Sequence, residues 1–234
     1  MNIKTKIFAD GADIETIKTL NDKDLIKGFT TNPSLMKNSN ISDYKEFALS
    51  ILSTVHSKPV SFEVLSDDLD LMYKEAKLIN SWAENIFIKI PIQNTKGTPT
   101  KELVASLCNE KVKCNITAIF TISQINELLE NLDENSRFIL SIFAGRIADT
   151  GVDPEPIFVE AKKITEKFSK SEILWASPRE AFNIIQANRS KCDIITLTPD
   201  YIKKMNNFGK DLNSFSLETV KMFYDDAKSI NIEL

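Results

Sequence analysis

The stretch Asn85-Ile86-Phe87-Ile88-Lys89-Ile90-Pro91-Ile92 decides the fold. Its run of β-branched and aromatic residues is typical of a strand that is buried on both faces, as strands of a parallel sheet are. Pro91 places the end of this strand close behind Lys89. A lysine inside such a strand loses its hydration, which favours the neutral amine, and a neutral amine can attack a carbonyl group to form a Schiff base. The alternative is that Lys89 turns outward and extends its amino group to water.

Seven further apolar segments of similar length occur along the chain. Together with the first they predict eight strands, at Lys6–Asp10, Gly28–Thr30, Val60–Val64, Ile86–Pro91, Val112–Ala118, Phe138–Phe143, Ile173–Ala176 and Asp193–Leu197. The stretches between them space their apolar residues as amphipathic helices do, for example in 67–84. This alternation predicts an α/β chain that forms a single (β/α)8 TIM barrel domain over residues 1–234. A doubly wound open sheet is the alternative, but no GxGxxG turn follows the first strand.

Two more helical patterns follow the eighth strand. They are predicted as Pro199–Met205 and as a terminal helix at about 215–230, with Ser216 as its N-cap. The terminal pattern is amphipathic, so we expect this helix to close the barrel or to dock on another subunit, which would make the protein a homo-oligomer. No strongly apolar surface helix is evident from the sequence, and this argues against a scaffold protein.

Composition narrows the function classes. The formal net charge is −4 and no basic tract dominates, so nucleic-acid binding is not indicated. No apolar run reaches the roughly 18–20 residues that a membrane span needs. The three cysteines are irregularly spaced and there is one histidine, so neither a disulfide framework nor a zinc site is indicated. We expect a reducing, cytoplasmic location.

Polar residues gather where the predicted strands end, which is where barrels of this kind carry their active sites. In chain order they are Asp10, Thr30 to Ser34 (including Asn32), Glu63, Lys89, Asn115, Thr117, Ser141, Arg146, Ser177, Arg179, Thr196 and Thr198. Some have ordinary structural explanations: Asp10 as a helix cap, Asn32 in a turn before proline, and Glu63 paired with a surface lysine. Two carboxylates and a lysine are nevertheless costly in a core, because buried charges lose hydration. Their combination therefore favours an acid–base site.

These side chains suit aldol chemistry through a Schiff base. Lys89 would attack a ketone, while one carboxylate would move protons during dehydration. The other carboxylate would accept the proton whose loss breaks a C–C bond. Near the rim, Arg146, Ser177 and Arg179 provide two guanidinium groups and a hydroxyl, which suit a phosphate group.

The residues at the strand ends resemble the transaldolase family in its short form, which includes the fructose-6-phosphate aldolases. The resemblance covers Ile7 to about Leu197. It is carried by Ala9-Asp10-Gly11-Ala12-Asp13, Gly28-Phe29-Thr30-Thr31-Asn32-Pro33-Ser34-Leu35, Ile88-Lys89-Ile90-Pro91, Asn115-Ile116-Thr117, Phe143-Ala144-Gly145-Arg146-Ile147 and Ala176-Ser177-Pro178-Arg179. The most specific part of the resemblance is the motif at 28–35 combined with the motif at 88–91.

The resemblance implies a class I mechanism that needs no metal or organic cofactor. Lys89 is implied as the Schiff-base lysine, Asp10 as the acid/base in C–C cleavage, and Glu63 with Thr117 as the groups that handle a catalytic water. The implied contacts to the dihydroxyacetone unit are Asn32, Asn115 and Ser141, and the implied phosphate contacts are Arg146, Ser177 and Arg179. The implied reaction, in the pentose phosphate pathway, moves a dihydroxyacetone unit from sedoheptulose 7-phosphate to glyceraldehyde 3-phosphate. It yields erythrose 4-phosphate and fructose 6-phosphate.

Two positions favour group transfer over outright cleavage. The fructose-6-phosphate aldolases resemble a barrel with glutamine on the third strand and tyrosine after the sixth, whereas this chain has Glu63 and Phe143. A tyrosine hydroxyl can help to protonate the enamine, and a phenyl ring beside the substrate cannot. Lys96 departs from the family pattern, because an acid is common at its position. The alternatives are a fructose-6-phosphate aldolase and, from another class, a sugar-phosphate-binding barrel without catalysis.

Overall fold

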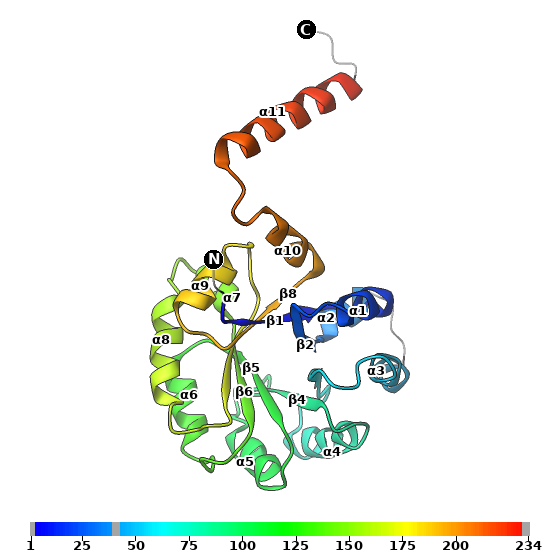
Figure 1. The fold of residues 1–234 in the computed structure, drawn as a ribbon. Coiled ribbons are helices and arrows are strands. Elements are labelled where there is room, and N and C mark those ends of the chain that lie inside the picture. Colours follow the sequence, from blue (N-terminus) through cyan, green and yellow to red (C-terminus); the bar gives the residue numbers. More distant parts are fainter. Residues whose placement is uncertain (1–2, 39–42, 231–234) are drawn as a thin grey trace.

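The computed structural model describes residues 3–38 and 43–230. In that part of the chain, eight parallel strands close into a barrel in which each pairs with its sequence neighbours and β8 pairs with β1. The strands are β1 (Lys6–Asp10), β2 (Ile26–Thr30), β3 (Val60–Glu63), β4 (Ile86–Pro91), β5 (Cys114–Ile119), β6 (Phe138–Ile142), β7 (Glu172–Trp175) and β8 (Ile194–Leu197). Helices alternate with the strands and surround them (Figure 1). The predicted (β/α)8 barrel with extra C-terminal helices is therefore confirmed.

The helices between the strands are short, and local sequence signals start several of them. They are α1 (Ile14–Asn21), α2 (Pro33–Asn38), α3 (Tyr44–Leu52), α4 (Leu69–Asn80), α5 (Lys101–Asn109), α6 (Ile122–Leu129), α7 (Ala144–Ala148), α8 (Glu155–Ile164) and α9 (Asn183–Arg189). The Asp13 carboxylate accepts the Thr16 N–H at 2.8 Å and so caps α1. Thr121 and Gln124 form a capping box at the start of α6.

Two strands begin two residues away from the predicted position. β2 begins two residues early, at Ile26, which is fully buried and pairs with Ile7 of β1. β5 begins two residues late, because the Val112 N–H bonds to the Leu107 carbonyl at 3.0 Å and closes the end of α5. Lys111 takes the left-handed conformation in that turn, with φ of 67°. The remaining differences are one residue at one end of β3, β6 and β8, one residue at the C-terminal end of β5, and a shift of β7 by one residue at both ends.

The C-terminal helices depart furthest from expectation. They are α10 (Pro199–Lys204), the 3-10 turn η1 (Met205–Asn207) and α11 (Leu212–Ser229). Asp211 caps α11, so the prediction of Ser216 as N-cap is wrong. No residue of α11 is buried, and the helix stands away from the barrel (Figure 1). It therefore does not close the barrel, and docking on another subunit stays a prediction.

The apolar face of α11 is exposed. Leu212 is 81% exposed, and Val220, Phe223 and Tyr224 are each at least 60% exposed. No strongly apolar surface helix was evident from the sequence, whereas α11 exposes several large apolar side chains. The helix pattern was amphipathic, but its apolar residues lie on the surface because, in the described part of the chain, no residue of α11 is buried against the barrel.

The lower interior of the barrel, towards the strands' N-terminal ends, is apolar. Phe8, Phe87, Ile139 and Ile194 form a buried cluster there, which Leu174 and Ala176 extend upward to the cavity at the opposite mouth. Gly28 makes room for the Phe8 ring, since a Cβ at position 28 would lie 2.5 Å from the ring Cζ atom. This cluster closes the barrel from below and leaves the polar strand ends facing the opposite mouth.

Candidate active site

Lys89 lies inside the C-terminal mouth of the barrel. It is only 7% exposed, and it pairs in register with Glu63 of the neighbouring strand β3. The Lys89 Nζ lies 3.0 Å from Glu63 Oε2 and donates a hydrogen bond to the Thr31 carbonyl at 2.9 Å. The inward orientation of Lys89 is therefore the observed one. Glu63 pairs with this buried lysine and not with a surface lysine.

Asp10 ends β1 on the same side of the barrel. The Thr30 hydroxyl donates to Asp10 Oδ1 at 2.8 Å, and the Asn32 amide donates to Oδ2 at 3.4 Å. Burial raises the pKa of Asp10 above the ordinary carboxyl range, against the opposing effects of the Lys89 ammonium and the Thr30 hydrogen bond. A carboxyl group in this state is suited to exchanging a proton with a ligand.

Asn115 and Ser141 lie deeper, on β5 and β6. The Ser141 hydroxyl donates to Asn115 Oδ1 at 2.6 Å, and the Asn115 amide donates to the Ser61 hydroxyl at 3.0 Å. Asn115 is fully buried. The structure thus places the Asn115 amide in a chain of hydrogen bonds beneath the mouth, with Ser141 between it and the cavity.

Thr117 and Phe143 occupy the wall next to these residues. The Thr117 hydroxyl is buried and, among the described residues, has no hydrogen-bond partner. A buried hydroxyl without a partner is costly, which is typical of a group that a ligand or water completes. Phe143 follows β6, and its ring lies 6.0 Å from that of Phe120 at a tilt of 37°. Ala118, next to Thr117, has a φ of 58°, an uncommon conformation that clusters at functional sites.

The rim carries Arg146 on α7 and Arg179 in the loop after β7. Arg179 Nε lies 3.0 Å from Asp149 Oδ1, and this pairing holds the pKa of Asp149 below its usual range. Gly145 brings α7 against that loop, because a Cβ at this position would lie 1.6 Å from the Ser177 carbonyl oxygen. Ser177 itself has a φ of 60°. The close approach of the two segments places both arginines on one side of the mouth.

These side chains line one cavity of about 500 Å³. All the predicted site residues line it except Asn115, namely Asp10, Asn32, Glu63, Lys89, Thr117, Ser141, Phe143, Arg146, Ser177 and Arg179. Residues 94–97, which include the unusual Lys96, do not line it. Among the described residues, no group of three or more His, Cys, Asp or Glu side chains is placed to hold a metal ion.

Sequence reasoning left three site residues unassigned. Thr30 contacts Asp10, and its hydroxyl is hydrogen-bonded to that of Thr196. Side chains alternate between the two faces of a strand, and both threonines occupy positions that point into the barrel, as Asp10 and Lys89 do. This alternation could have predicted their place in the site. The Tyr44 hydroxyl donates to the backbone carbonyl of Glu63 at 2.8 Å, and burial raises the pKa of Tyr44. It reaches the site from α3, and nothing in the local sequence pattern indicates that contact.

Fold and site together define a (β/α)8 barrel with a buried lysine and two carboxylates at its C-terminal mouth. The chain belongs to the transaldolase/fructose-6-phosphate aldolase family, whose model matches residues 7–234. This family consists of aldolase and transaldolase enzymes.

Relatives cover nearly the whole chain. A "Probable transaldolase" from Nitrosopumilus maritimus is 31% identical over 232 residues, covering 98% of this chain and 99% of that protein. Proteins of the same name from Methanococcus maripaludis and Brucella ovis are each 34% identical and cover 86% of this chain, with 90% and 88% of their own lengths matched. A crystal structure of a protein from Burkholderia cenocepacia matches with a TM-score of 0.59 at 9% identity, over 89% of this chain and 82% of that one. That similarity supports the fold alone. No helix in the described part of the chain is long and apolar enough to span a membrane.

Proposed function

We propose that this protein is a transaldolase that works through a Schiff base on Lys89. It would transfer a dihydroxyacetone unit from sedoheptulose 7-phosphate to glyceraldehyde 3-phosphate, giving erythrose 4-phosphate and fructose 6-phosphate. The observation that carries the proposal is the Lys89 amine, which is buried at the mouth of the barrel and lies 3.0 Å from the Glu63 carboxylate. We place the reaction in the pentose phosphate pathway in the cytoplasm. The three cysteines, which are buried and free, accord with a reducing location.

Imine formation is the first half of the proposed reaction. The neutral amine of Lys89 adds to the C2 carbonyl of the ketose, and the resulting carbinolamine loses water to give an iminium ion. Glu63 is close enough to the nitrogen to move the protons of these steps, with Thr117 contacting the departing water. No metal or organic cofactor enters the proposed steps.

Cleavage of the C3–C4 bond follows. A base removes the proton of the C4 hydroxyl, the C4 aldehyde leaves, and the electron pair is held as an enamine on Lys89. Asp10 is the proposed base, and Thr30 and Asn32 hold its carboxylate. The enamine then adds to the aldehyde carbon of glyceraldehyde 3-phosphate while Asp10 returns its proton to the aldehyde oxygen, and hydrolysis of the imine by water releases fructose 6-phosphate and the free Lys89 amine.

The remaining cavity residues are proposed to bind the sugar phosphate. Asn32 and Ser141 would contact the dihydroxyacetone unit, with Asn115 orienting Ser141 from below. Arg146, Ser177 and Arg179 would bind the phosphate at the rim. The phenyl ring of Phe143 has no acidic proton to give to the enamine, which favours transfer to an aldehyde acceptor.

An acceptor-dependence assay tests this proposal against its alternatives. The protein is given fructose 6-phosphate with or without erythrose 4-phosphate, and glyceraldehyde 3-phosphate is measured. We expect product only when the acceptor is present. Equal release of free dihydroxyacetone and glyceraldehyde 3-phosphate without acceptor would identify a fructose-6-phosphate aldolase. Binding without turnover in either mixture would identify a non-catalytic barrel. The variant Phe143→Tyr is the matched comparison, and we expect it to raise the acceptor-independent release.

A further inference from the structure

Two cations meet at the N-terminal mouth of the barrel, opposite the candidate active site. Lys113 and Arg137 directly precede the paired strands β5 and β6, which start in register at Cys114 and Phe138. Lys113 Nζ lies 5.7 Å and Arg137 Cζ lies 5.5 Å from the centroid of the same ring, that of Phe87. Like charges side by side on neighbouring strands are unfavourable. This pair therefore needs a compensating feature.

No carboxylate of the described residues forms an ion pair with either cation. Lys113 instead donates to the backbone carbonyl of Glu84. Burial and the neighbouring Arg137 charge lower the pKa of Lys113, and the Glu84 carboxylate, which forms no ion pair with it, acts in the opposite direction. The Phe87 ring offers a weak attraction to cations, and that attraction does not neutralise two positive charges.

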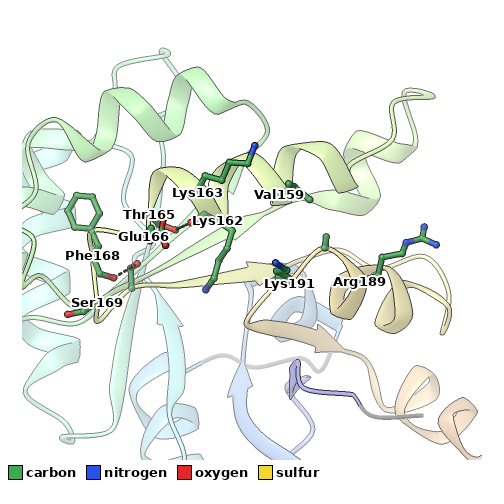
Figure 2. Close-up of a pocket in the computed structure, with 11 residues that line it drawn as sticks. Val159, Lys162, Lys163, Thr165, Glu166, Phe168, Ser169, Arg189 and Lys191 are labelled. Atoms are coloured by element: carbon green, nitrogen blue, oxygen red, sulfur yellow. Dashed lines mark hydrogen bonds between the residues drawn. The ribbon is translucent and has the colours of Figure 1, made fainter.

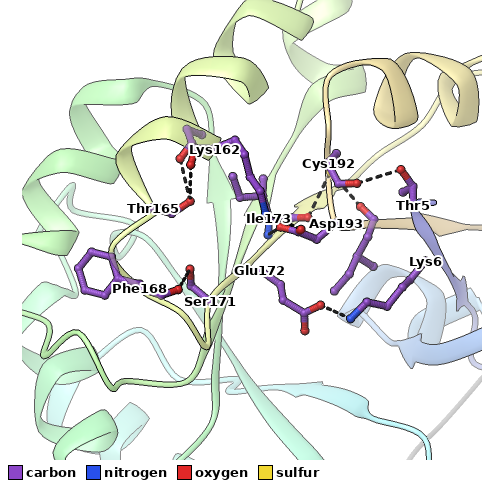
Figure 3. Close-up of polar contacts among 12 residues, drawn as sticks. Thr5, Lys6, Lys162, Thr165, Phe168, Ser171, Glu172, Ile173, Cys192 and Asp193 are labelled. Carbon is purple, nitrogen blue, oxygen red and sulfur yellow. Dashed lines mark hydrogen bonds and ion pairs between the residues drawn. The ribbon is translucent and has the colours of Figure 1, made fainter.

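Several other cations at this end of the barrel do form ion pairs. Figure 3 shows Lys6 of β1 bonded to Glu172 of β7, and Lys162 of α8 bonded to Asp193. Between α8 and α9, a cavity of about 520 Å³ is lined by several basic residues (Figure 2). There Lys163 pairs with Glu160 and Arg189 pairs with Glu155. Missing carboxylate partners are thus not a general property of this end of the molecule.

A cavity of about 800 Å³ opens beside the unpaired cations, and we call it the basic cavity. Lys111, Lys113, Arg137 and Lys170 line it, and Asp133 is the one carboxylate among its lining residues. The Asp133 carboxylate already accepts the Asn135 N–H at 2.8 Å. The chain as a whole has a net charge of −4, so this concentration of positive charge is local.

We propose that the basic cavity binds the phosphate group of a small phosphorylated molecule, with Lys113 and Arg137 as its principal ligands. A phosphate group fits because a guanidinium binds it with two parallel hydrogen bonds, while an ammonium adds a point charge. Lys111 and Lys170 lie at the wall of the cavity and supply further positive charge. The bound anion also removes the repulsion between Lys113 and Arg137. This site is at the opposite end of the barrel from Lys89 and does not depend on the proposed reaction.

Calorimetric titration of the full chain with inorganic phosphate tests the proposal. We expect saturable binding that Arg137→Gln weakens about tenfold or more, as loss of a hydrogen bond between charged groups does. Lys163→Gln is the matched control, because it removes a basic residue from the cavity of Figure 2, and it should bind as the native chain does. Because Arg179 is itself a proposed phosphate ligand, the titration is repeated in Arg179→Gln. The phosphate binding that remains in this variant should still be weakened by Arg137→Gln, which separates the basic cavity from the candidate active site. No binding at millimolar phosphate, or equal affinity in Arg137→Gln, would overturn the proposal.

Thermal unfolding supplies a second measurement, which separates a binding role from a structural one. If Arg137 serves an anion, Arg137→Gln without phosphate should melt no lower than the native chain, because a like-charge contact is lost. In the Arg179→Gln background, which removes the proposed rim contact, added phosphate should raise the Tm of the chain that keeps Arg137 and leave that of the chain that also carries Arg137→Gln unchanged. A lower Tm for the variant, with no effect of phosphate on the native chain, would make Arg137 a structural cation over Phe87 and refute the site.

Discussion

The lower and upper halves of the barrel interior are built by the same strands but differ in chemistry. Several strands carry an apolar residue in the lower half and a polar one two positions later: Phe8 and Asp10, Phe87 and Lys89, Ile139 and Ser141, Ile194 and Thr196. Because side chains two apart in a strand share a face, each pair points into the barrel at successive levels. The lower level contributes apolar burial, whereas the upper level contains partly compensated charges and hydroxyls.

We therefore expect inward positions on the same strand to differ in effect, the lower ones on stability and the upper ones on turnover. Changes in the lower level should cost folding free energy, because they remove buried apolar contacts. Changes in the upper level should lower turnover with little loss of stability, because the charged groups there have lost hydration on burial and contribute little to the free energy of folding. Substitutions at neighbouring inward positions therefore test the comparison directly.

The largest effect is expected at Lys89. Replacement by methionine keeps the length of the side chain and removes the proposed nucleophile, so turnover should fall by about 10⁴-fold or more while the fold is retained. Steady-state rates with sugar phosphates, together with circular dichroism, give the two readouts. Lys101→Met removes another ion-paired lysine, on α5, and should keep normal turnover. Normal turnover in Lys89→Met would end the proposed mechanism.

The matching change in the lower level is Phe8→Ala. Phe8 is 2% exposed and its ring fills the space above Gly28, so its loss should reduce the free energy of unfolding by about 3–5 kcal/mol. Urea denaturation measures this loss. Leu25→Ala, at a leucine that is 47% exposed, should stay within about 0.5 kcal/mol of the native chain. An equally small loss for Phe8→Ala would mean that the lower level does not stabilise the barrel.

A smaller effect is expected at the rim. Arg179→Ala should raise KM for phosphorylated substrates about 10- to 100-fold with less change in kcat, because one charge-assisted contact to the phosphate is lost. The matched control is Arg189→Ala, which removes an arginine paired with Glu155 outside the site. If KM is unchanged in Arg179→Ala, Arg179 does not bind the phosphate.

The smallest change in stability, and the one that depends on pH, is expected from Asp10→Asn. A carboxyl whose pKa is raised by folding costs stability when it is ionised, and this cost disappears below its unfolded pKa. The variant should therefore melt at a higher temperature than the native chain at pH 7, and the gain should shrink as the pH falls towards about 4. Turnover should fall in the same variant. Asp24→Asn, at an exposed aspartate, should show no such trend. A variant that is less stable at pH 7 would show that the Asp10 carboxylate stabilises the fold through Lys89 and Thr30.

The barrel could be predicted from the sequence because strands and helices are specified mainly by residues close together in the chain. Strand runs, helical spacing and capping residues such as Asp13 depend on near neighbours, and the family motifs lie at the strand ends that line the cavity. Contacts between distant segments were not predictable in this way. Asn115 lies beneath the cavity because Ser61 and Ser141 bind both ends of its amide, and Arg179 is held by Asp149. The terminal helix was misjudged because an amphipathic pattern does not say what covers its apolar face.

The most direct test of the central claim is chemical trapping of the imine. The protein is incubated with fructose 6-phosphate and borohydride, its intact mass is measured by mass spectrometry, and it is then digested to locate the adduct. Because borohydride reduces an imine to a stable amine, we expect one dihydroxyacetone-sized addition, on Lys89. A folded sample that gains no mass, or that gains it on another lysine, would contradict the account.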